Sequence, residues 1–101
     1  MAEVKTCRTM QEVRVEIDRL DRELVGLLAE RAGYVAQAGR IKQRAEDIRD
    51  DARIEEVVAK VRERSRAEGL DPDVAEATWR AMIEAFIRFE AAVFERREER
   101  E

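Results

Sequence analysis

The sequence predicts an all-α protein whose chain forms a long helix, a short helix and a second long helix. Apolar residues recur at alternating spacings of three and four over long stretches, which is the pattern of one helix face. Alanine, glutamate, arginine and leucine dominate the composition, and they favour helices. The chain has 101 residues, 45% of them apolar and 44% charged, so we expect one water-soluble domain over residues 1–101.

The first helix is expected to begin after Thr9 and to run to about Arg44, with residues 1–8 as an N-terminal lead. Thr9 and Glu12 have the spacing of an N-terminal capping box. At 1.5 Å per residue this helix would be roughly 50 Å long. Three glycines within it either permit close packing or are tolerated at its surface. Its apolar face consists of Met10, Val13, Ile17, Leu20, Leu24, Leu27, Tyr34, Ala38 and Ile41.

The short helix is expected over about residues 51–67. Residues 45–51 lose the apolar spacing and gain aspartates, so they are predicted to form a loop that leads to its N-cap. Gly69 is suited to end the helix, because glycine is favoured just after a helix C-terminus. The apolar residues of this helix are Ile54, Val57, Val58 and Val61.

The third helix is expected to begin at Pro72, capped by Asp71, and to run to about Arg97. Residues 98–101 are highly charged and are predicted to be a fraying tail. The apolar face of this helix consists of Ala75, Trp79, Met82, Ile83, Phe86, Val93 and Phe94.

A helix of roughly 50 Å cannot be covered by two other helices of unequal length in so short a chain. The first helix should therefore overhang the rest of the chain. We expect an intertwined homodimer, in which two long helices pack side by side and bury the remaining apolar face.

The composition excludes several kinds of functional site. The chain has no histidine, so it lacks the usual general base, the Ser-His and Cys-His pairs and His-based metal sites. No calcium-loop spacing or glycine-rich phosphate loop is present. Cys7 stands alone, so no internal disulfide is expected. We therefore expect no metal and no cofactor, and any chemistry must use arginine, lysine and carboxyl groups.

The partners and the location are also limited by the sequence. A net charge of −4 argues against nucleic acid as the main partner. No run of about 18 apolar residues is present, so no membrane partner is expected. The N-terminus lacks the apolar core of a signal peptide, and the cytoplasm is the expected location.

Charged residues interrupt the apolar faces at several places. Arg31 occupies an apolar position of the first helix, and Glu90 does so in the third. Lys42, Arg14 and Arg53 lie beside apolar positions. Each has a structural interpretation, such as a buried Arg31–Glu90 ion pair that fixes the helix register. Together, however, four cations near the inner faces of a small bundle indicate a site for an anion.

Arginine binds carboxylates in a bidentate manner, so the cations predict a small dicarboxylate ligand. Arg14 and Arg31 are seventeen residues apart, which is about 25 Å along one helix. They cannot both contact one small molecule from the same chain. In an antiparallel pair of long helices, Arg14 of one subunit can approach Arg31 of the other, so the site also requires the homodimer.

The segment EIDRLDRELVGLLAERAGYVAQAGRIK resembles the first helix of the all-helical chorismate mutases, including the related isochorismate pyruvate lyases. The shared elements are I-D-x-L-D, L-L-x-x-R and a lysine, Lys42, eleven residues after Arg31. The resemblance covers nearly the whole chain. It implies an intertwined homodimer with two shared sites, and the Claisen rearrangement of chorismate to prephenate in aromatic amino acid biosynthesis.

The resemblance also implies roles for individual residues. Arg14 from the partner subunit and Arg31 would hold the two carboxylates of the substrate, and Arg53 would be a third arginine of the site. Lys42 would bond the ether oxygen and a carboxylate, and Glu90 would bond the ether oxygen from the other side. The reaction is pericyclic and needs no cofactor; Lys42, Glu90 and Arg31 are the expected catalytic residues.

Two positions depart from the pattern of many mutases. Ile54 replaces a glutamate that follows the third arginine, and Phe86 replaces a serine found in some members. Both changes resemble the isochorismate pyruvate lyases, whereas a glutamate at position 90 is more typical of a mutase. A lyase that forms salicylate, an aminodeoxychorismate mutase and a non-enzymatic dimeric helical interaction module remain alternatives.

Overall fold

The computed structural model describes residues 3–100, including their side chains as far as residue 97. These residues form three α-helices and one 3-10 turn, with no strand among them, so the all-α prediction is confirmed. The helices are α1 (Met10–Ile41), α2 (Asp51–Glu68) and α3 (Pro72–Arg100), and the turn η1 (Ala45–Asp47) lies between α1 and α2.

The N-termini of α1 and α2 have the side-chain caps that the sequence predicts. The Thr9 hydroxyl accepts a hydrogen bond from the Glu12 N–H at 3.2 Å. The Asp50 carboxylate accepts one from the Arg53 N–H at 3.0 Å. Gly69 ends α2 in the left-handed conformation, with φ of 77°, which a glycine adopts without steric cost. These boundaries follow from local chemistry.

The start of α3 also follows the sequence prediction. The Asp71 carboxylate accepts a hydrogen bond from the Asp73 N–H at 2.9 Å, and Pro72 is the first helical residue. The backbone stays helical to Arg100, beyond the end expected near Arg97. Residue 101 of the predicted tail and residues 1–2 of the predicted lead lie outside the described residues.

The C-terminus of α1 comes earlier than the sequence predicts. The helix ends at Ile41 and not near Arg44, because Lys42 leaves the helical conformation, with ψ of 138°. Arg97 of α3 donates hydrogen bonds to carbonyls of this last turn. The helix therefore ends where a side chain from a distant part of the sequence satisfies its carbonyls.

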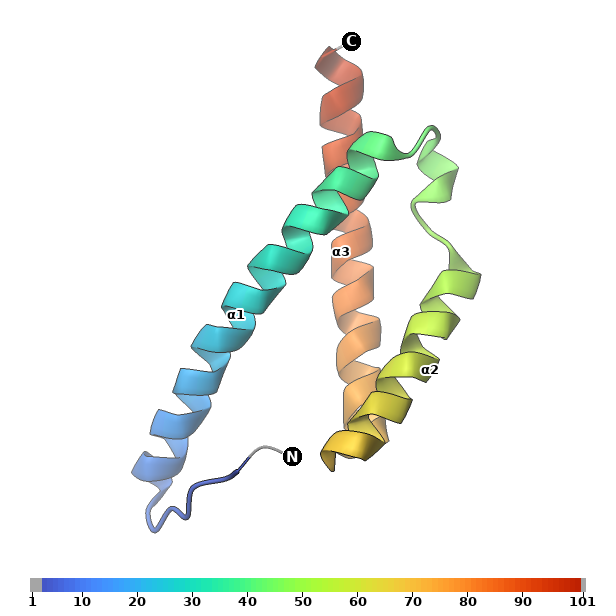
Figure 1. The fold of residues 1–101 in the computed structure, drawn as a ribbon. Helices are drawn as coiled ribbons and strands as arrows, with labels where there is room; N and C mark the ends of the chain where they lie inside the picture. Colours follow the sequence, from blue (N-terminus) through green and yellow to red (C-terminus); the bar gives the residue numbers. More distant parts are fainter. Residues whose placement is uncertain (1–2, 101) are drawn as a thin grey trace.

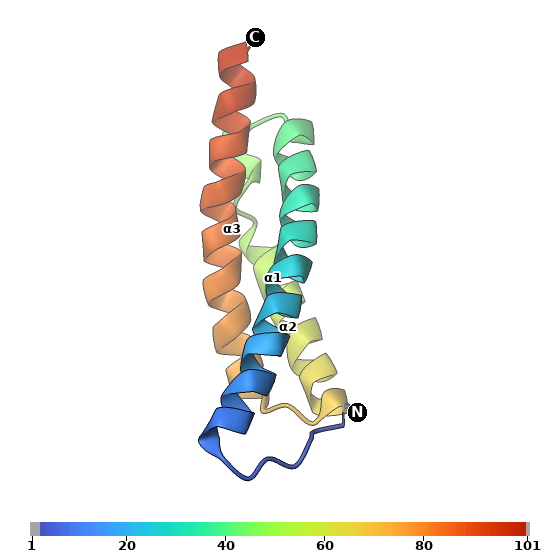
Figure 2. The same ribbon diagram turned by 90° about the vertical axis from the view of Figure 1, so that its left-hand side faces the viewer.

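The third helix lies at the centre of the fold. α3 packs against both α1 and α2, as Figures 1 and 2 show from two directions. The molecule is elongated, with extents of 57 × 26 × 17 Å. Its buried apolar residues are Ala36, Ile48, Val58, Ala75, Ile83, Val93 and Phe94.

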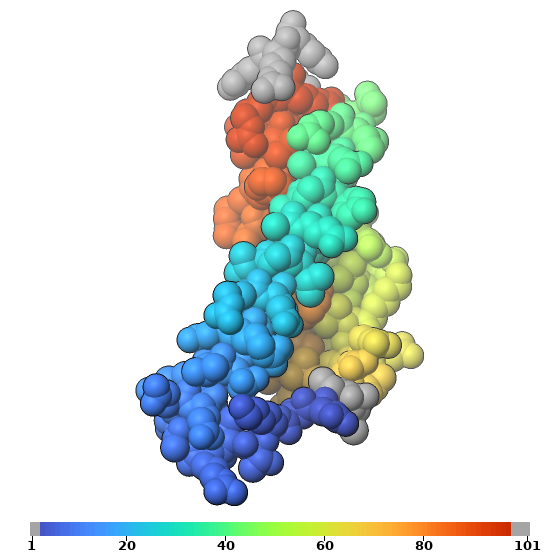
Figure 3. All heavy atoms as spheres, turned by 60° about the vertical axis from the view of Figure 1, so that its left-hand side comes forward, coloured from blue at the N-terminus to red at the C-terminus, as the bar shows by residue number. Residues whose placement is uncertain are grey.

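The N-terminal half of α1 lies outside this core. It diverges from α3 towards its start, and the length of α1 crosses the front of the molecule in Figure 3. Only Ala36 and Gly39 of α1 are buried. The exposed large apolar residues of α1 include Met10, Ile17, Leu20, Leu24, Val25, Leu27 and Leu28. The predicted overhang of α1 is thus confirmed within one chain.

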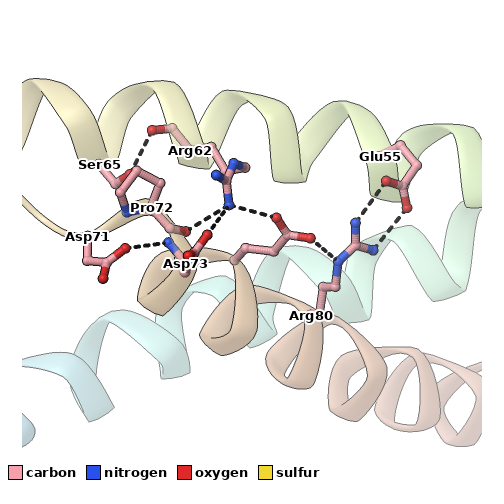
Figure 4. A network of polar contacts seen from close by, with 8 residues as sticks. Glu55, Arg62, Ser65, Asp71, Pro72, Asp73 and Arg80 are labelled. Carbon is pink, nitrogen blue, oxygen red and sulfur yellow. Dashed lines mark hydrogen bonds and ion pairs between the residues drawn. The ribbon is translucent and has the colours of Figure 1, made fainter.

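Arginine–carboxylate pairs join the facing sides of α2 and α3 (Figure 4). Arg80 makes two bonds to Glu55, at 2.8 and 2.9 Å, and one to Glu76 at 2.7 Å. Arg62 reaches Glu76 at 2.9 Å and Asp73 at 3.1 Å. Hydrogen bonds from Arg80 lower the pKa of both Glu55 and Glu76. Because these groups lie near the surface, the pairs orient α2 on α3 more than they stabilise the fold.

Within residues 3–100, none of the helices combines the length and the apolar character that a membrane span requires.

Candidate active site

A cavity of about 380 Å³ lies between the three helices, next to the turn η1. Three cationic side chains line it, Arg31 from α1, Lys42 at the end of α1 and Arg53 from α2. Ile83, Phe86, Ile87 and Glu90 of α3 form the opposite wall. Of the five predicted site residues, the fold therefore brings four together in one chain.

Arg31 is held over an aromatic ring. Its guanidinium carbon lies 4.8 Å from the centroid of the Phe86 ring, in a cation–π contact. Burial and, to a smaller extent, the neighbouring Arg53 lower the pKa of Arg31. An arginine still remains charged at neutral pH. Among the described side chains Arg31 forms no ion pair, so its planar donors are available to an anion.

Lys42 and Glu90 form an ion pair across the contact of α1 and α3. The Nζ–Oε2 distance is 2.6 Å, and Glu90 is only 6% exposed. The pair is close, but its angles do not make a hydrogen bond to Oε2 within the described part of the chain. The alternative in which Glu90 pairs with Arg31 is wrong, because Lys42 occupies that place.

Arg53 stands at the edge of the cavity. Its side chain is 58% exposed and contacts Glu56, one turn later in α2, at 2.5 Å. Two carboxylates besides Glu90 line the cavity, those of Asp50 and Asp47, and both have partners. Asp50 caps α2, and Asp47 lies 3.7 Å from Arg44. Arg31 and Lys42 are therefore the inner cations of the site.

Arg14 does not take part in this cavity. It is exposed on the N-terminal half of α1, seventeen residues before Arg31, and is absent from the cavity lining. On one helix this separation corresponds to about 25 Å. Within a single chain the predicted fifth residue is therefore not assembled with the other four.

Gly39 allows α1 and α3 to approach each other beside Glu90. A Cβ atom at this position would lie 3.2 Å from both Glu90 Cγ and Glu90 O, and 3.3 Å from Val93 Cγ1. Gly26 and Gly33 have no atom within 4 Å of the same position. Of the two interpretations of the glycines, close packing thus holds for Gly39 and surface tolerance for the other two.

Sequence reasoning missed the contact that orients Arg31. Phe86 was placed on the apolar face of its helix, but its stacking on Arg31 depends on how α1 crosses α3. The edge-to-face contact of Phe86 with Phe89, at 6.0 Å between centroids, further fixes this ring. The sequence indicated only that Arg31 and Phe86 both occupy positions on the apolar faces of their helices.

The described residues contain no cluster of three Asp, Glu or Cys side chains placed to hold a metal ion. The donors of the cavity are instead ammonium and guanidinium groups, which bind anions.

The family model described as chorismate mutase type II matches residues 13–91. The chain belongs to this family. The matched residues include Arg14, Arg31, Lys42, Arg53 and Glu90, and the family indicates chorismate mutase activity, an isomerisation in aromatic amino acid biosynthesis. A search of curated proteins gives no match.

We expect Gly39→Ala to lower both stability and turnover. The new methyl group would press on Glu90 and Val93, and such overpacking costs about 1–3 kcal/mol. It would also displace the Glu90 carboxyl from Lys42. Urea unfolding and a chorismate assay measure the two effects.

Gly33→Ala is the matched control, because its methyl group would meet no neighbouring atom. Replacing glycine by alanine inside a helix raises the free energy of unfolding by up to about 1 kcal/mol. If Gly39→Ala and Gly33→Ala behave alike in both assays, Gly39 has no role in the contact with Glu90.

Proposed function

We propose that this cavity binds chorismate and that Arg31, Lys42, Arg53 and Glu90 of one chain act there with Arg14 of a second chain. The observation that carries this proposal is the convergence of three cations and one buried carboxyl on a single cavity. Its volume of about 380 Å³ lies within the range of roughly 300–1,000 Å³ that is usual for small-molecule sites.

The two substrate carboxylates would be held by arginines. Arg31 supports this role because its guanidinium is already oriented by Phe86 and has no carboxylate partner among the described residues. Arg14 of the second chain would bind the other carboxylate, and Arg53 would add positive charge at the edge. Held at both ends, the substrate would be kept in the compact conformation that reacts.

Lys42 and Glu90 would act on the ether oxygen. In the rearrangement the C–O bond breaks as a new C–C bond forms within the same molecule. No proton, nucleophile or cofactor is needed. The ether oxygen gains negative charge in the transition state, and the Lys42 ammonium would stabilise that charge.

Glu90 can assist only in its protonated form. An ionised carboxylate only accepts hydrogen bonds and would repel the ether oxygen, whereas a carboxylic acid can donate one. In the structure Glu90 faces Lys42 at 2.6 Å. When Lys42 binds the substrate in place of Glu90, a protonated Glu90 would donate a hydrogen bond to the ether oxygen from the opposite side.

The active form would be a homodimer. The exposed apolar residues of α1 need a cover, and a second α1 running antiparallel would supply it. The same arrangement would carry Arg14 of one chain to the cavity of the other. We place this biosynthetic enzyme in the cytoplasm.

A second candidate activity is the cleavage of isochorismate to salicylate and pyruvate. The observation that favours it is that Ile54 and Phe86, the two residues that resemble the lyases, both line the cavity. The purified protein should be given each substrate separately. Prephenate from chorismate supports the mutase, and salicylate from isochorismate supports the lyase.

Arg31→Leu and Lys42→Leu should each lower chorismate turnover by on the order of 100-fold, because Arg31→Leu removes a group that holds a substrate carboxylate and Lys42→Leu removes the charge beside the ether oxygen. Arg31→Leu should melt close to the wild type, whereas Lys42→Leu should melt at a lower temperature while remaining folded, because it leaves the buried Glu90 carboxyl without its partner. Arg22→Leu is the matched control, since Arg22 is an exposed arginine of α1 outside the cavity. Wild-type turnover in both cavity variants would contradict the proposed site.

Wild-type turnover should be higher at acidic pH, because the proposed role requires Glu90 to donate a hydrogen bond. Glu90→Gln should flatten this profile, because an amide donates a hydrogen bond at every pH. Initial rates measured between roughly pH 5 and pH 9 test this, with the fold of both proteins checked at each pH. An identical profile shape in the two proteins, without an acidic rise, would show that Glu90 does not act as a donor.

A further inference from the structure

Arg97 of α3 binds the C-terminal end of α1 through hydrogen bonds. Its Nη1 donates towards three carbonyls of the last turn, Gly39 O at 3.3 Å, Arg40 O at 2.6 Å and Lys42 O at 2.5 Å. The last carbonyls of a helix have no partner within the helix. A cation is also favoured there by the helix dipole. One guanidinium thus holds the turn from which Lys42 emerges.

The Arg97 guanidinium is itself held in place. Its central carbon lies 4.5 Å from the centroid of the Phe94 ring, and Phe94 is buried. Glu90 and Arg97 are seven residues apart, which is about two helical turns, so both lie on the same side of α3. The side chain of Lys42 is therefore held by Glu90 and its backbone by Arg97.

Lys42 is the residue at which the chain leaves α1. Its ψ of 138° directs the backbone into the connection that carries Asp47 and Ile48 to the cavity. A shift of the last turn would move the Lys42 ammonium directly. Misplacement of a reacting group by about 1 Å can cost roughly 100-fold in rate.

We propose that Arg97 is a positioning residue for the mutase reaction, which fixes the end of α1 so that the Lys42 ammonium points into the cavity. This inference rests on the role of Lys42 in the proposed function. Residue 97 lies outside the matched residues 13–91, and it does not line the cavity. Arg97 would act through Lys42 and would not touch the substrate.

A guanidinium suits this task better than an ammonium group because it also stacks on Phe94. In Arg97 the Nη1 atom alone reaches the three carbonyls, and the rest of the planar group lies over the Phe94 ring, a contact that the compact lysine ammonium does not reproduce. Arg97→Lys should therefore recover only part of the effect that Arg97→Met removes.

The test compares four proteins: the wild type, Arg97→Met, Lys42→Met and the double variant. For each, kcat and KM for chorismate are measured, together with a thermal melt. Arg97→Met should lower kcat by roughly tenfold to 100-fold with a much smaller change in KM. In the Lys42→Met background the same substitution should leave the residual kcat unchanged, because there is no ammonium left to position.

Arg96→Met is the matched control, since Arg96 is the exposed neighbour of Arg97 on the same helix. It should have wild-type kcat. If Arg97→Met equals this control, or if it lowers kcat by the same factor in both backgrounds, Arg97 does not act through Lys42 and the inference is overturned.

The outcome for Lys42→Met separates this inference from the proposed function. Wild-type turnover in Lys42→Met overturns the role of Lys42, and the inference with it. Low turnover in Lys42→Met beside normal turnover in Arg97→Met overturns the inference alone. If Arg97→Met does not fold, Arg97→Lys is read in the same two backgrounds, with a partial loss of kcat expected only where Lys42 is present.

Discussion

A helix of 32 residues cannot be buried by the other helices of this chain, and this constraint shapes the whole molecule. Only Ala36 and Gly39 of α1 are buried, and both lie in its C-terminal part. The apolar side chains of the other part face water, although each Å² of apolar surface that leaves water gains about 25 cal/mol. In the proposed homodimer, a second copy of α1 would cover these side chains.

The same constraint accounts for the distribution of charge. Where α1 meets α3, the cations Arg31 and Lys42 face a largely apolar wall and one carboxyl, Glu90. Lys42 is paired with Glu90, but Arg31 has no carboxylate partner among the described residues, so an anion bound beside Arg31 would compensate its charge. Where α1 leaves α3, it carries Arg14 away from its own cavity. In the proposed homodimer, one α1 helix would thus contribute to two sites.

Much of the fold was predictable because its determinants are local. Thr9, Asp50 and Gly69 set helix ends through their own side chains or backbone conformation. The predicted end of α1 was about three residues too late, and in the structure Arg97, more than fifty residues later, donates to a carbonyl of the last turn. A contact between residues so far apart in the sequence cannot be predicted from local sequence patterns.

The candidate site shows the same division. Arg31 and Glu90 could be identified as candidate site residues from the sequence, because each places a charge among the apolar residues of a helix face. A charge in such a position is unfavourable unless it has a partner or a ligand. Their partners were not predictable, because the crossing of α1 and α3 decides which side chains meet. That crossing places Lys42, and not Arg31, beside Glu90, and it stacks Arg31 on Phe86.

Complementation between two inactive variants tests the central claim that each site draws on two chains. Arg14→Ala and Arg31→Ala are prepared separately, with different tags, and are then unfolded and refolded together. In a mixed dimer one site lacks both arginines and the other has both. Each pure variant should be nearly inactive, and the mixture should recover about a quarter of the wild-type sites if the chains pair at random. Purified mixed dimers that remain as inactive as their parents would contradict a site shared between two chains.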